Sequence, residues 1–335
     1  YTDNLVGTTN VNGGLISTPS YYSASLTDSS DYSTEIGLND RLRLTERTTA
    51  WLGLRHTQLN RQSAQTDGSA AKQEARGVST PWLALSHQPT HSYTVYASYG
   101  QGLETEVVPN LNNPNTALSY TNAGQPLPAL KSTQREIGIK TQFAQTAWQV
   151  TWFDITRPAT ADAPVICNNI PPACIYTRKI DGQNHHQGLE ISTQTKLTRW
   201  DLDASAMRLD AKRENAMVQT DLNGQHPINV PKYILRGMAE YRSTSIVGLR
   251  SGLRLSHEGE RNVTEYGAIM LPAWTTVDAT THYDTKVNHV ASTWTLAINN
   301  LANKHYWRES PKQYGQYFLY PGAPRTIRAT IQFHL

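Results

Sequence analysis

Two cysteines and two adjacent histidines are the residues of this chain best suited to covalent or metal chemistry. Cys167 and Cys174 stand at the ends of the segment "CNNIPPAC". Such a pair forms either a disulfide or part of a metal site, and no His, Asp or Glu lies between them, which favours the disulfide. His185 and His186 are neighbours, and neighbours on a strand point to opposite faces. The sequence therefore predicts a disulfide and no metal site.

A run of aromatic and basic residues near the C-terminus has the composition of a binding surface. Aromatic rings pack on flat or acyl surfaces, and cations bind anionic groups. The run contains Tyr306, Trp307, Arg308, Lys312, Tyr314, Tyr317, Phe318 and Tyr320. In the whole chain Tyr (17) and Trp (8) far outnumber Phe (4) and Met (4), a balance that suits rings with one wet end.

Catalysis and nucleic-acid binding find no support in the sequence. A hydrolase needs Ser, His and a carboxylate or amide that converge on one face. No Gly-x-Ser-x-Gly segment is present, and Ser256 and His257 are neighbours that would face opposite ways. The formal net charge of +3 is spread along the chain without a block of like charge. We therefore predict no catalytic residue, no covalently bound cofactor and no nucleic-acid partner.

The elements that position these residues show an apolar period of two. In the last ten residues Ile327, Ile331 and Phe333 alternate with polar or charged side chains, the pattern of a strand with one apolar face. We count about thirteen such strands of roughly ten residues or more, and no segment has an apolar period of 3.6. Similar runs occupy 32–43, 49–60, 79–88, 92–103, 132–140, 147–158, 185–192, 200–212, 231–243, 247–256, 277–283 and 294–299.

Strand length and connection length together predict an outer-membrane β-barrel. Only 38% of residues are hydrophobic, mean hydropathy is −0.53, and no apolar stretch approaches the length of a helical membrane span. Strands that cross a bilayer need about nine to eleven residues. Short connections near 45–48, 88–91, 144–146, 197–199, 243–245 and 285–289 alternate with long ones near 61–78, 104–130, 159–176, 213–229, 258–270 and 304–322.

Short turns on one side and long loops on the other are typical of such barrels, with an apolar face toward lipid and a polar face toward a wet lumen. A soluble β-sandwich or β-helix is the alternative, but it does not explain the asymmetry of the connections. If the last strand runs toward the periplasm, the strand at 32–43 runs the same way. Residues 1–31 are then expected to be an external loop segment, and 32–335 the C-terminal portion of a larger barrel.

Several segments resemble the later barrel strands of TonB-dependent siderophore receptors. The resemblance covers nearly the whole chain from about residue 32 onward, and its order and spacing are specific although no single piece is a catalytic signature. The segments are "STQREIGIK" (132–140), "FDITRP" (153–158), "HHQGLEIS" (185–192), "NVPKY" (229–233), "LPAWTTVDA" (271–279), "AINNLANKHYW" (297–307) and "YPGAPRTIRATIQF" (320–333).

The resemblance implies a transmembrane antiparallel barrel of about 22 strands whose lumen is filled by a preceding plug. Such receptors sit in the bacterial outer membrane among lipid and lipopolysaccharide. They import ferric siderophores with energy from the TonB-ExbB-ExbD complex, which acts on an N-terminal TonB box. The chain is then expected to supply about thirteen C-terminal strands, without plug or box. A passive porin of about sixteen strands remains the alternative, and ion conductance without TonB would favour it.

In receptors of this kind the external loops capture the ligand, so the resemblance implies ligand contacts for the exposed rings. We expect these at Tyr314, Tyr317, Tyr320, Trp307 and Tyr120. For Trp307 an interfacial girdle, and for the mid-loop tyrosines simple loop packing, are competing interpretations. The resemblance covers receptors for hydroxamate, catecholate, citrate and haem ligands alike.

Charged residues on the polar faces of the strands are expected to line the barrel interior. They would pair with one another, contact the plug or solvate the wall. These residues are Glu136, Lys140, Glu190, Arg250, Arg254, Asp278 and Arg328.

Overall fold

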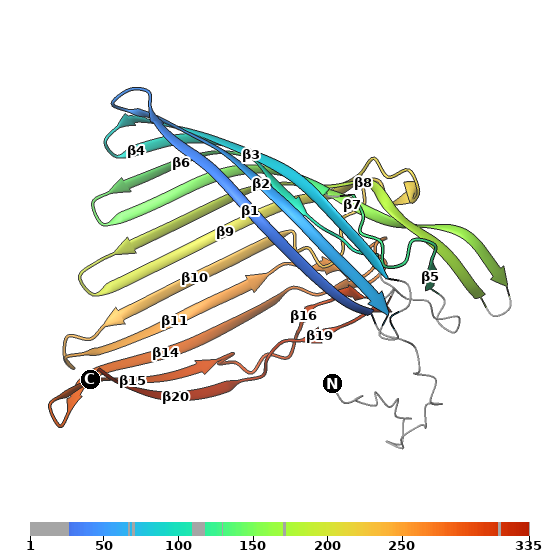
Figure 1. The fold of residues 1–335 in the computed structure, drawn as a ribbon. Helices are drawn as coiled ribbons and strands as arrows, with labels where there is room; N and C mark the ends of the chain where they lie inside the picture. Colours follow the sequence, from blue (N-terminus) through green and yellow to red (C-terminus); the bar gives the residue numbers. More distant parts are fainter. Residues whose placement is uncertain are drawn as a thin grey trace, which may run out of the picture.

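The computed structural model describes residues 27–65, 68, 71–108, 118–128, 130–169, 172–313 and 316–334. These residues form a curved, open antiparallel sheet (Figure 1). The single helical element among them is a 3-10 turn, η1 (Thr220–Leu222). None of the described helical residues forms a helix long and apolar enough to cross a membrane.

The main sheet consists of successive hairpins, so that neighbours in sequence are neighbours in space. The short β5 (Leu118–Tyr120) pairs in parallel with β8 outside this path. In order the strands of the path are β1 (Thr27–Arg43), β2 (Thr48–Gln65), β3 (Lys72–Thr90), β4 (Tyr93–Glu104), β6 (Leu130–Phe143), β7 (Thr146–Asn169), β8 (Pro172–Lys196), β9 (Trp200–Glu214), β10 (Tyr233–Arg242), β11 (Leu249–Glu258), β14 (Trp274–Val287), β15 (Val290–Asn299) and β20 (Thr326–His334).

The short and long connections lie at opposite ends of the sheet, as the sequence predicts. The short turns lie on the left in Figure 1, where β20 also ends, and the long connections lie on the right. Small two-stranded ribbons form within the long connections: β12 (Arg261–Asn262) with β13 (Met270–Leu271), β16 (Trp307–Glu309) with β19 (Tyr320–Pro321), and β17 (Lys312–Gln313) with β18 (Gln316–Tyr317). Within the described ranges β1 and β20 are the two edges of the sheet and do not pair with each other.

The prediction of a long loop near 159–176 is wrong, because β7 and β8 continue through it as one hairpin. Their antiparallel register runs from the pair Thr146 and Thr195 out to the pair Asn169 and Pro172, with irregularities near Pro158 and Pro164. Proline cannot donate to a strand ladder, which explains why the pairing shifts there and why the apolar alternation fades. The expected external segment 1–31 lies mostly outside the described residues, and β1 begins at Thr27.

The strand register sorts side chains onto two faces. Leu189 lies opposite Trp152 and Arg208, and Ile191 lies opposite Val150 and Ala206. Leu189 and Ile191 stay 44% and 45% exposed, because no second layer of the described residues covers this face. Other large apolar residues exposed on the same face include Ile36, Leu38, Leu52, Leu54, Leu83, Leu85, Ile137, Leu202, Leu235, Leu253, Leu255, Leu296, Ile327 and Ile331.

The opposite face is polar and surrounds a hollow of about 970 Å³. Lys140, Arg236 and Arg254 line this hollow, so the polar face is the inner one. Arg254 lies directly opposite Asp278 in the register. The register places all the charges expected inside on this face: Glu136, Lys140, Glu190, Arg250, Arg254, Asp278 and Arg328. Arg250 contacts Glu240 at 3.8 Å and Asp284 at 3.3 Å, so some of these charges pair within the wall.

Candidate ligand-binding site at the long-connection end

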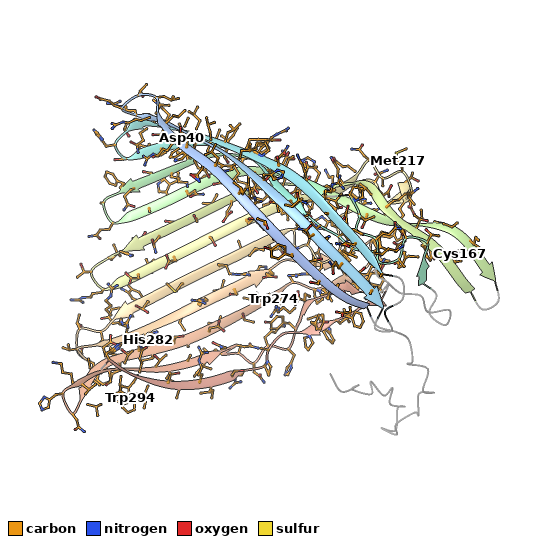
Figure 2. All side chains as sticks on the ribbon, in the orientation of Figure 1. Asp40, Cys167, Met217, Trp274, His282 and Trp294 are labelled. Atoms are coloured by element: carbon orange, nitrogen blue, oxygen red, sulfur yellow. A yellow bond between two sulfur atoms is a disulfide. The ribbon has the colours of Figure 1, made fainter. Side chains whose placement is uncertain are left out.

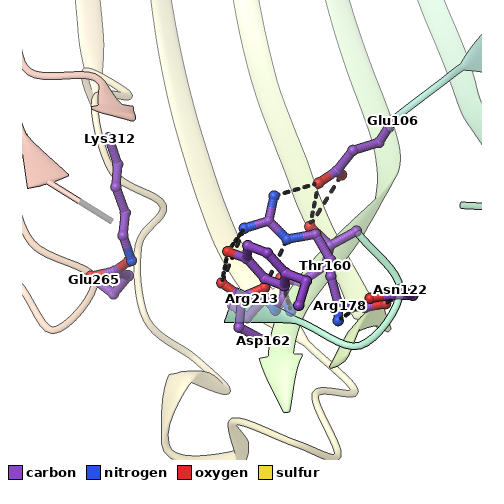
Figure 3. Close-up of polar contacts among 9 residues, drawn as sticks. Glu106, Asn122, Thr160, Asp162, Arg178, Arg213, Glu265 and Lys312 are labelled. Atoms are coloured by element: carbon purple, nitrogen blue, oxygen red, sulfur yellow. Dashed lines mark hydrogen bonds and ion pairs between the residues drawn. The ribbon is translucent and has the colours of Figure 1, made fainter. Parts of the chain in front are cut away.

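The long connections are tied to one another by polar side chains, and two groups stand out in Figure 3. One group surrounds Arg178 on β8, and the other joins Lys312 to Glu265. Each group joins residues that are far apart in the sequence. The long connections therefore contact one another at this end of the sheet through defined side-chain interactions.

Arg178 is the centre of the first group. Its Nε lies 2.7 Å from Asp162 Oδ1 and its Nη2 lies 3.0 Å from Asp162 Oδ2, a bidentate pair across the β7–β8 hairpin. Its Nη1 also donates to Glu106 Oε1 at 3.2 Å. Asn122 accepts from the Arg178 backbone N–H at 3.1 Å and donates to its carbonyl at 2.7 Å. These contacts hold Glu106 and Asn122, which lie between β4 and β6, against the hairpin.

Tyr120, one of the expected ligand contacts, is buried in this group with 8% exposure. It packs with Val108 and Leu127, and its hydroxyl donates to Asp162 Oδ2 at 3.0 Å. The Arg178 guanidinium lies 5.0 Å from the centre of the Tyr120 ring. Burial raises the pKa of Tyr120 to about 12. The ring therefore joins a loop to the hairpin, and its accessible surface for a ligand is small.

Cys167 lies near the tip of the same hairpin, on the right of Figure 2. Cys167 and Cys174 are directly opposite in the register, with their Cα atoms 4.1 Å apart, and form the disulfide expected from the sequence. Leu118 of β5 pairs with Cys174, so the cross-link also lies beside the docked loop.

Asp181 on β8 organises the connection between β9 and β10. Its carboxylate accepts hydrogen bonds from the backbone N–H groups of Met217 (2.7 Å), Val218 (2.8 Å) and Gln219 (3.3 Å). Arg213 lies beside it, 3.4 Å away. Burial alone would raise the pKa of Asp181, but the three amides and Arg213 hold this pKa below its ordinary value. No motif or periodic pattern in the sequence indicates this role for Asp181.

Tyr317, another expected ligand contact, belongs to the second group. Its hydroxyl donates to Glu265, and Lys312 donates to the other oxygen of Glu265 at 2.5 Å. The Lys312 ammonium lies 5.4 Å from the centre of the Tyr317 ring. Burial raises the pKa of Tyr317 to about 12, while the hydrogen bonds from Lys312 and Tyr317 outweigh burial and lower the pKa of Glu265. This group joins the last two long connections.

Of the remaining expected contacts, Trp307 and Tyr320 lie on the β16–β19 ribbon and are 44% and 43% exposed. Tyr314 lies outside the described residues. Nearby, Tyr306 packs against Trp274 with 4.6 Å between ring centres, and adds an aromatic pair that begins at β14. The structure therefore groups Tyr317 with charged residues, leaves Trp307 and Tyr320 exposed, and places Tyr120 in the separate group around Arg178.

The adjacent histidines do not share a site. His185 Nε2 lies 2.7 Å from Asp154, and its Nδ1 lies 3.2 Å from Glu214, across three strands. Its register neighbours place it on the face of Leu189, whereas His186 lies on the inner face. Across the described part of the chain no cluster of three His, Cys, Asp or Glu residues could hold a metal ion.

Comparison with known proteins identifies relatives of one kind. Residues 1–301 match the family described as TonB dependent receptor-like, beta-barrel. The chain is 26% identical over 310 residues to the ferrichrome receptor FcuA of Yersinia enterocolitica, covering 88% of this chain and 38% of that protein. It is 29% identical over 154 residues to the metal-pseudopaline receptor CntO of Pseudomonas aeruginosa, covering 45% of this chain and 21% of that protein.

Solved structures show the same fold. The ferric preacinetobactin receptor BauA from Acinetobacter baumannii superimposes with a TM-score of 0.73 and 26% identity, covering 92% of this chain and 44% of that one. The siderophore receptor PiuA from the same organism gives a TM-score of 0.71 at 18% identity, with 97% and 50% covered. The chain thus spans half or less of the length of these relatives.

Proposed function

Because the chain belongs to the TonB dependent receptor-like β-barrel family, we propose that it forms part of an outer-membrane receptor that imports ferric siderophores. The family consists of transporters and receptors of the outer membrane, and the relatives described above are siderophore or metallophore receptors by name. The chelate is the transported ligand, and no enzymatic step is part of the proposal.

The complete receptor is proposed to be a closed barrel of about 22 strands around a plug. Two observations support this architecture: the sheet has unpaired edges at β1 and β20 within the described ranges, and the chain covers half or less of these relatives. Lipid and lipopolysaccharide would contact the apolar face. The TonB-ExbB-ExbD complex would supply the energy for import through the part of the receptor that precedes the strands.

The observation that carries a binding role is the linked group of Tyr317, Lys312 and Glu265 at the end of the sheet that carries the long connections. Hydrogen bonds hold the Tyr317 ring in place before a ligand arrives, which lowers the ordering cost of binding. Trp307 and Tyr320 offer further exposed rings on the adjoining ribbon. These rings, with Tyr314, are proposed to contact the organic part of the chelate.

Replacement of Tyr314 and Tyr317 by Ala in the full-length receptor tests this assignment. We expect equilibrium binding of ferric siderophores to weaken by about tenfold or more, because two ring contacts are lost. Tyr32→Ala is a matched control, since this ring is exposed on the opposite strand edge, β1. Unchanged affinity in the double variant would refute the assignment. Ion conductance without energy coupling would instead support a passive diffusion channel.

A further inference from the structure

Resting on the proposed outer-membrane receptor, we infer that the outward face of strands β6 to β9 binds the phosphate groups of lipopolysaccharide. The register assigns each strand residue to the inner or the outward face, up to the irregularity at Pro158 in the β7–β8 hairpin. The discriminating observation is where positive charge occurs on the outward face, because most of that face is apolar and would meet hydrocarbon.

Outward-facing Lys and Arg residues are confined to two of the strands in the path. Counted over the described strand residues up to that irregularity, they are Lys131 and Arg135 on β6, and Arg208 and Lys212 on β9. All four are exposed, and each lies in the half of its strand that leads to a long connection. Long connections are external in barrels of this kind, so the four cations lie on the side of the outer leaflet.

Arg208 and Arg135 lie directly beside the apolar part of the outward face. The register neighbours of Arg208 are Leu189 on β8 and Tyr233 on β10. Arg135 lies two residues from Ile137, which is 61% exposed. A charge beside hydrocarbon is costly unless its long side chain reaches a polar layer. Their position is therefore suited to the level where acyl chains give way to headgroups, where tyrosine is also enriched.

The carboxylates of the same part of the outward face are engaged by other groups. Asp210 contacts the ammonium of Lys212 at 3.0 Å. Asp154 and Glu214 both contact His185, at 2.7 Å and 3.2 Å. These three carboxylates are thus held by a lysine and a histidine of neighbouring positions.

Lys131, Arg135 and Arg208 contact no carboxylate among the residues that the structure describes. The outward face of β6 to β9 carries four Lys or Arg side chains against three carboxylates, so it has an excess of positive charge before His185 is counted. The other outward-facing carboxylates in the counted residues, Asp28 and Asp40, lie on β1, which β2, β3 and β4 separate from β6.

The chemistry that fits these cations is a phosphate attached to an acyl lipid. A guanidinium whose planar fork is not already used can bind a phosphate through two parallel hydrogen bonds. Cations near a membrane surface also attract anionic lipid headgroups. Because Arg208 lies beside the exposed Leu189, one lipid molecule can place its phosphate on the cation and its acyl chains on the apolar face. The phosphorylated lipid anchor of lipopolysaccharide has both parts.

Native mass spectrometry of the full-length receptor tests this inference with two lipids. One is the lipopolysaccharide anchor with its phosphates, and the other is the same lipid after its phosphates have been removed. We expect the phosphorylated lipid to bind about tenfold or more tightly, and this advantage to shrink as the ionic strength rises. Equal affinity for the two lipids would overturn the inference.

Variants of the two arginines locate the site. Arg135→Gln combined with Arg208→Gln should lower the affinity for the phosphorylated lipid about tenfold and leave that for the dephosphorylated lipid unchanged. Arg135→Lys with Arg208→Lys keeps both charges and should bind the phosphorylated lipid more tightly than the Gln pair. Arg254→Gln is the matched control, because Arg254 lines the hollow on the inner face. Unchanged affinity in the Gln pair, or an equal loss in the control, would contradict the inference.

Ferric siderophore binding, measured on the same preparations, separates this inference from the proposed function. We expect the Gln pair to leave siderophore affinity unchanged, because both arginines lie on the outward face. Siderophore binding by a receptor that does not prefer the phosphorylated lipid would overturn the inference and leave the proposed function standing. A receptor that binds no ferric siderophore would instead overturn the proposed function.

Discussion

The carboxylate of Asp181 is buried against the guanidinium of Arg213, with 3.4 Å between Oδ2 and Nη2 and side-chain exposures of 1% and 9%. The two residues come from neighbouring strands, β8 and β9. The same carboxylate accepts hydrogen bonds from the backbone N–H groups of Met217, Val218 and Gln219. The Asp181 carboxylate thus pairs with a buried cation and also accepts hydrogen bonds from the backbone N–H groups at the start of the connection between β9 and β10. A buried pair of this kind is costly to break, because the remaining charge has no partner.

Asp181→Ala is expected to loosen the 215–229 connection without unfolding the sheet. The change leaves Arg213 buried without a carboxylate and removes three acceptor contacts, so local stability should fall by about 3 kcal/mol. Amide hydrogen exchange at 217–219 measures this fall. Asp210→Asn is the control, because its pair with Lys212 is exposed and should contribute less than about 1 kcal/mol. Equal exchange in the two variants would contradict the role of Asp181.

The pH dependence of this connection follows from the lowered pKa of Asp181. A carboxylate whose pKa is lower in the folded than in the unfolded protein adds stability that is fully present above its unfolded pKa, about 3.9. That stability is lost as the pH falls through the lower, folded value. Protection of the amides at 217–219, corrected for intrinsic exchange, should therefore persist down to about pH 4 and decline only below it. Loss of protection between about pH 7 and 5 would be inconsistent with this carboxylate.

The disulfide predicts that Cys167 and Cys174 are both unreactive toward alkylation in the receptor isolated without reductant. Closing so short a segment lowers the conformational entropy of the unfolded chain, which on the entropy model stabilises the folded hairpin by roughly 2–3 kcal/mol. Reduction should therefore increase hydrogen exchange at the hairpin tip while the strands near Leu189 stay protected. Mass spectrometry after alkylation checks the first expectation, and two labelled thiols would refute the disulfide.

Tyr120→Phe separates a packing role from ligand contact. The variant keeps the buried ring but loses the hydroxyl that donates to Asp162 at 3.0 Å and accepts from Arg178 at 3.0 Å. Docking of the 118–128 segment should weaken by about 1–2 kcal/mol, visible as faster amide exchange there. Chelate affinity lowered without any change in exchange would show instead that the hydroxyl contacts the ligand directly.

The strands and their faces could be predicted because a period of two is a local signal. The alternation of Leu189 and Ile191 with Glu190 was enough to assign faces, and the register agrees. The far halves of β7 and β8 were missed because prolines and two bulges interrupt that alternation. In that half Val165, Ile166, Ile175 and Ile180 do not follow a period of two, so the alternation gives no clear face there.

The site could be predicted only in part, because its contacts join distant segments. An aromatic run at 306–320 indicated a binding surface, but nothing in that run indicated that Tyr317 would meet Glu265. Tyr120 was expected to be exposed as a loop tyrosine, yet the parallel pairing of β5 with β8 buries it. Asp181 and Arg178 lie among residues with no motif, and their roles depend entirely on which strands are adjacent.

The central claim is that alternate side chains face lipid and an aqueous interior. Single spin labels at 189, 190, 191 and 192 of β8, in the full-length receptor in lipid bilayers, test it most directly. We expect collision rates with oxygen, which is soluble in lipid, to be high at 189 and 191 and low at 190 and 192. A water-soluble nickel reagent should not reach 189 or 191. Oxygen accessibility that fails to alternate along these four positions would contradict the account.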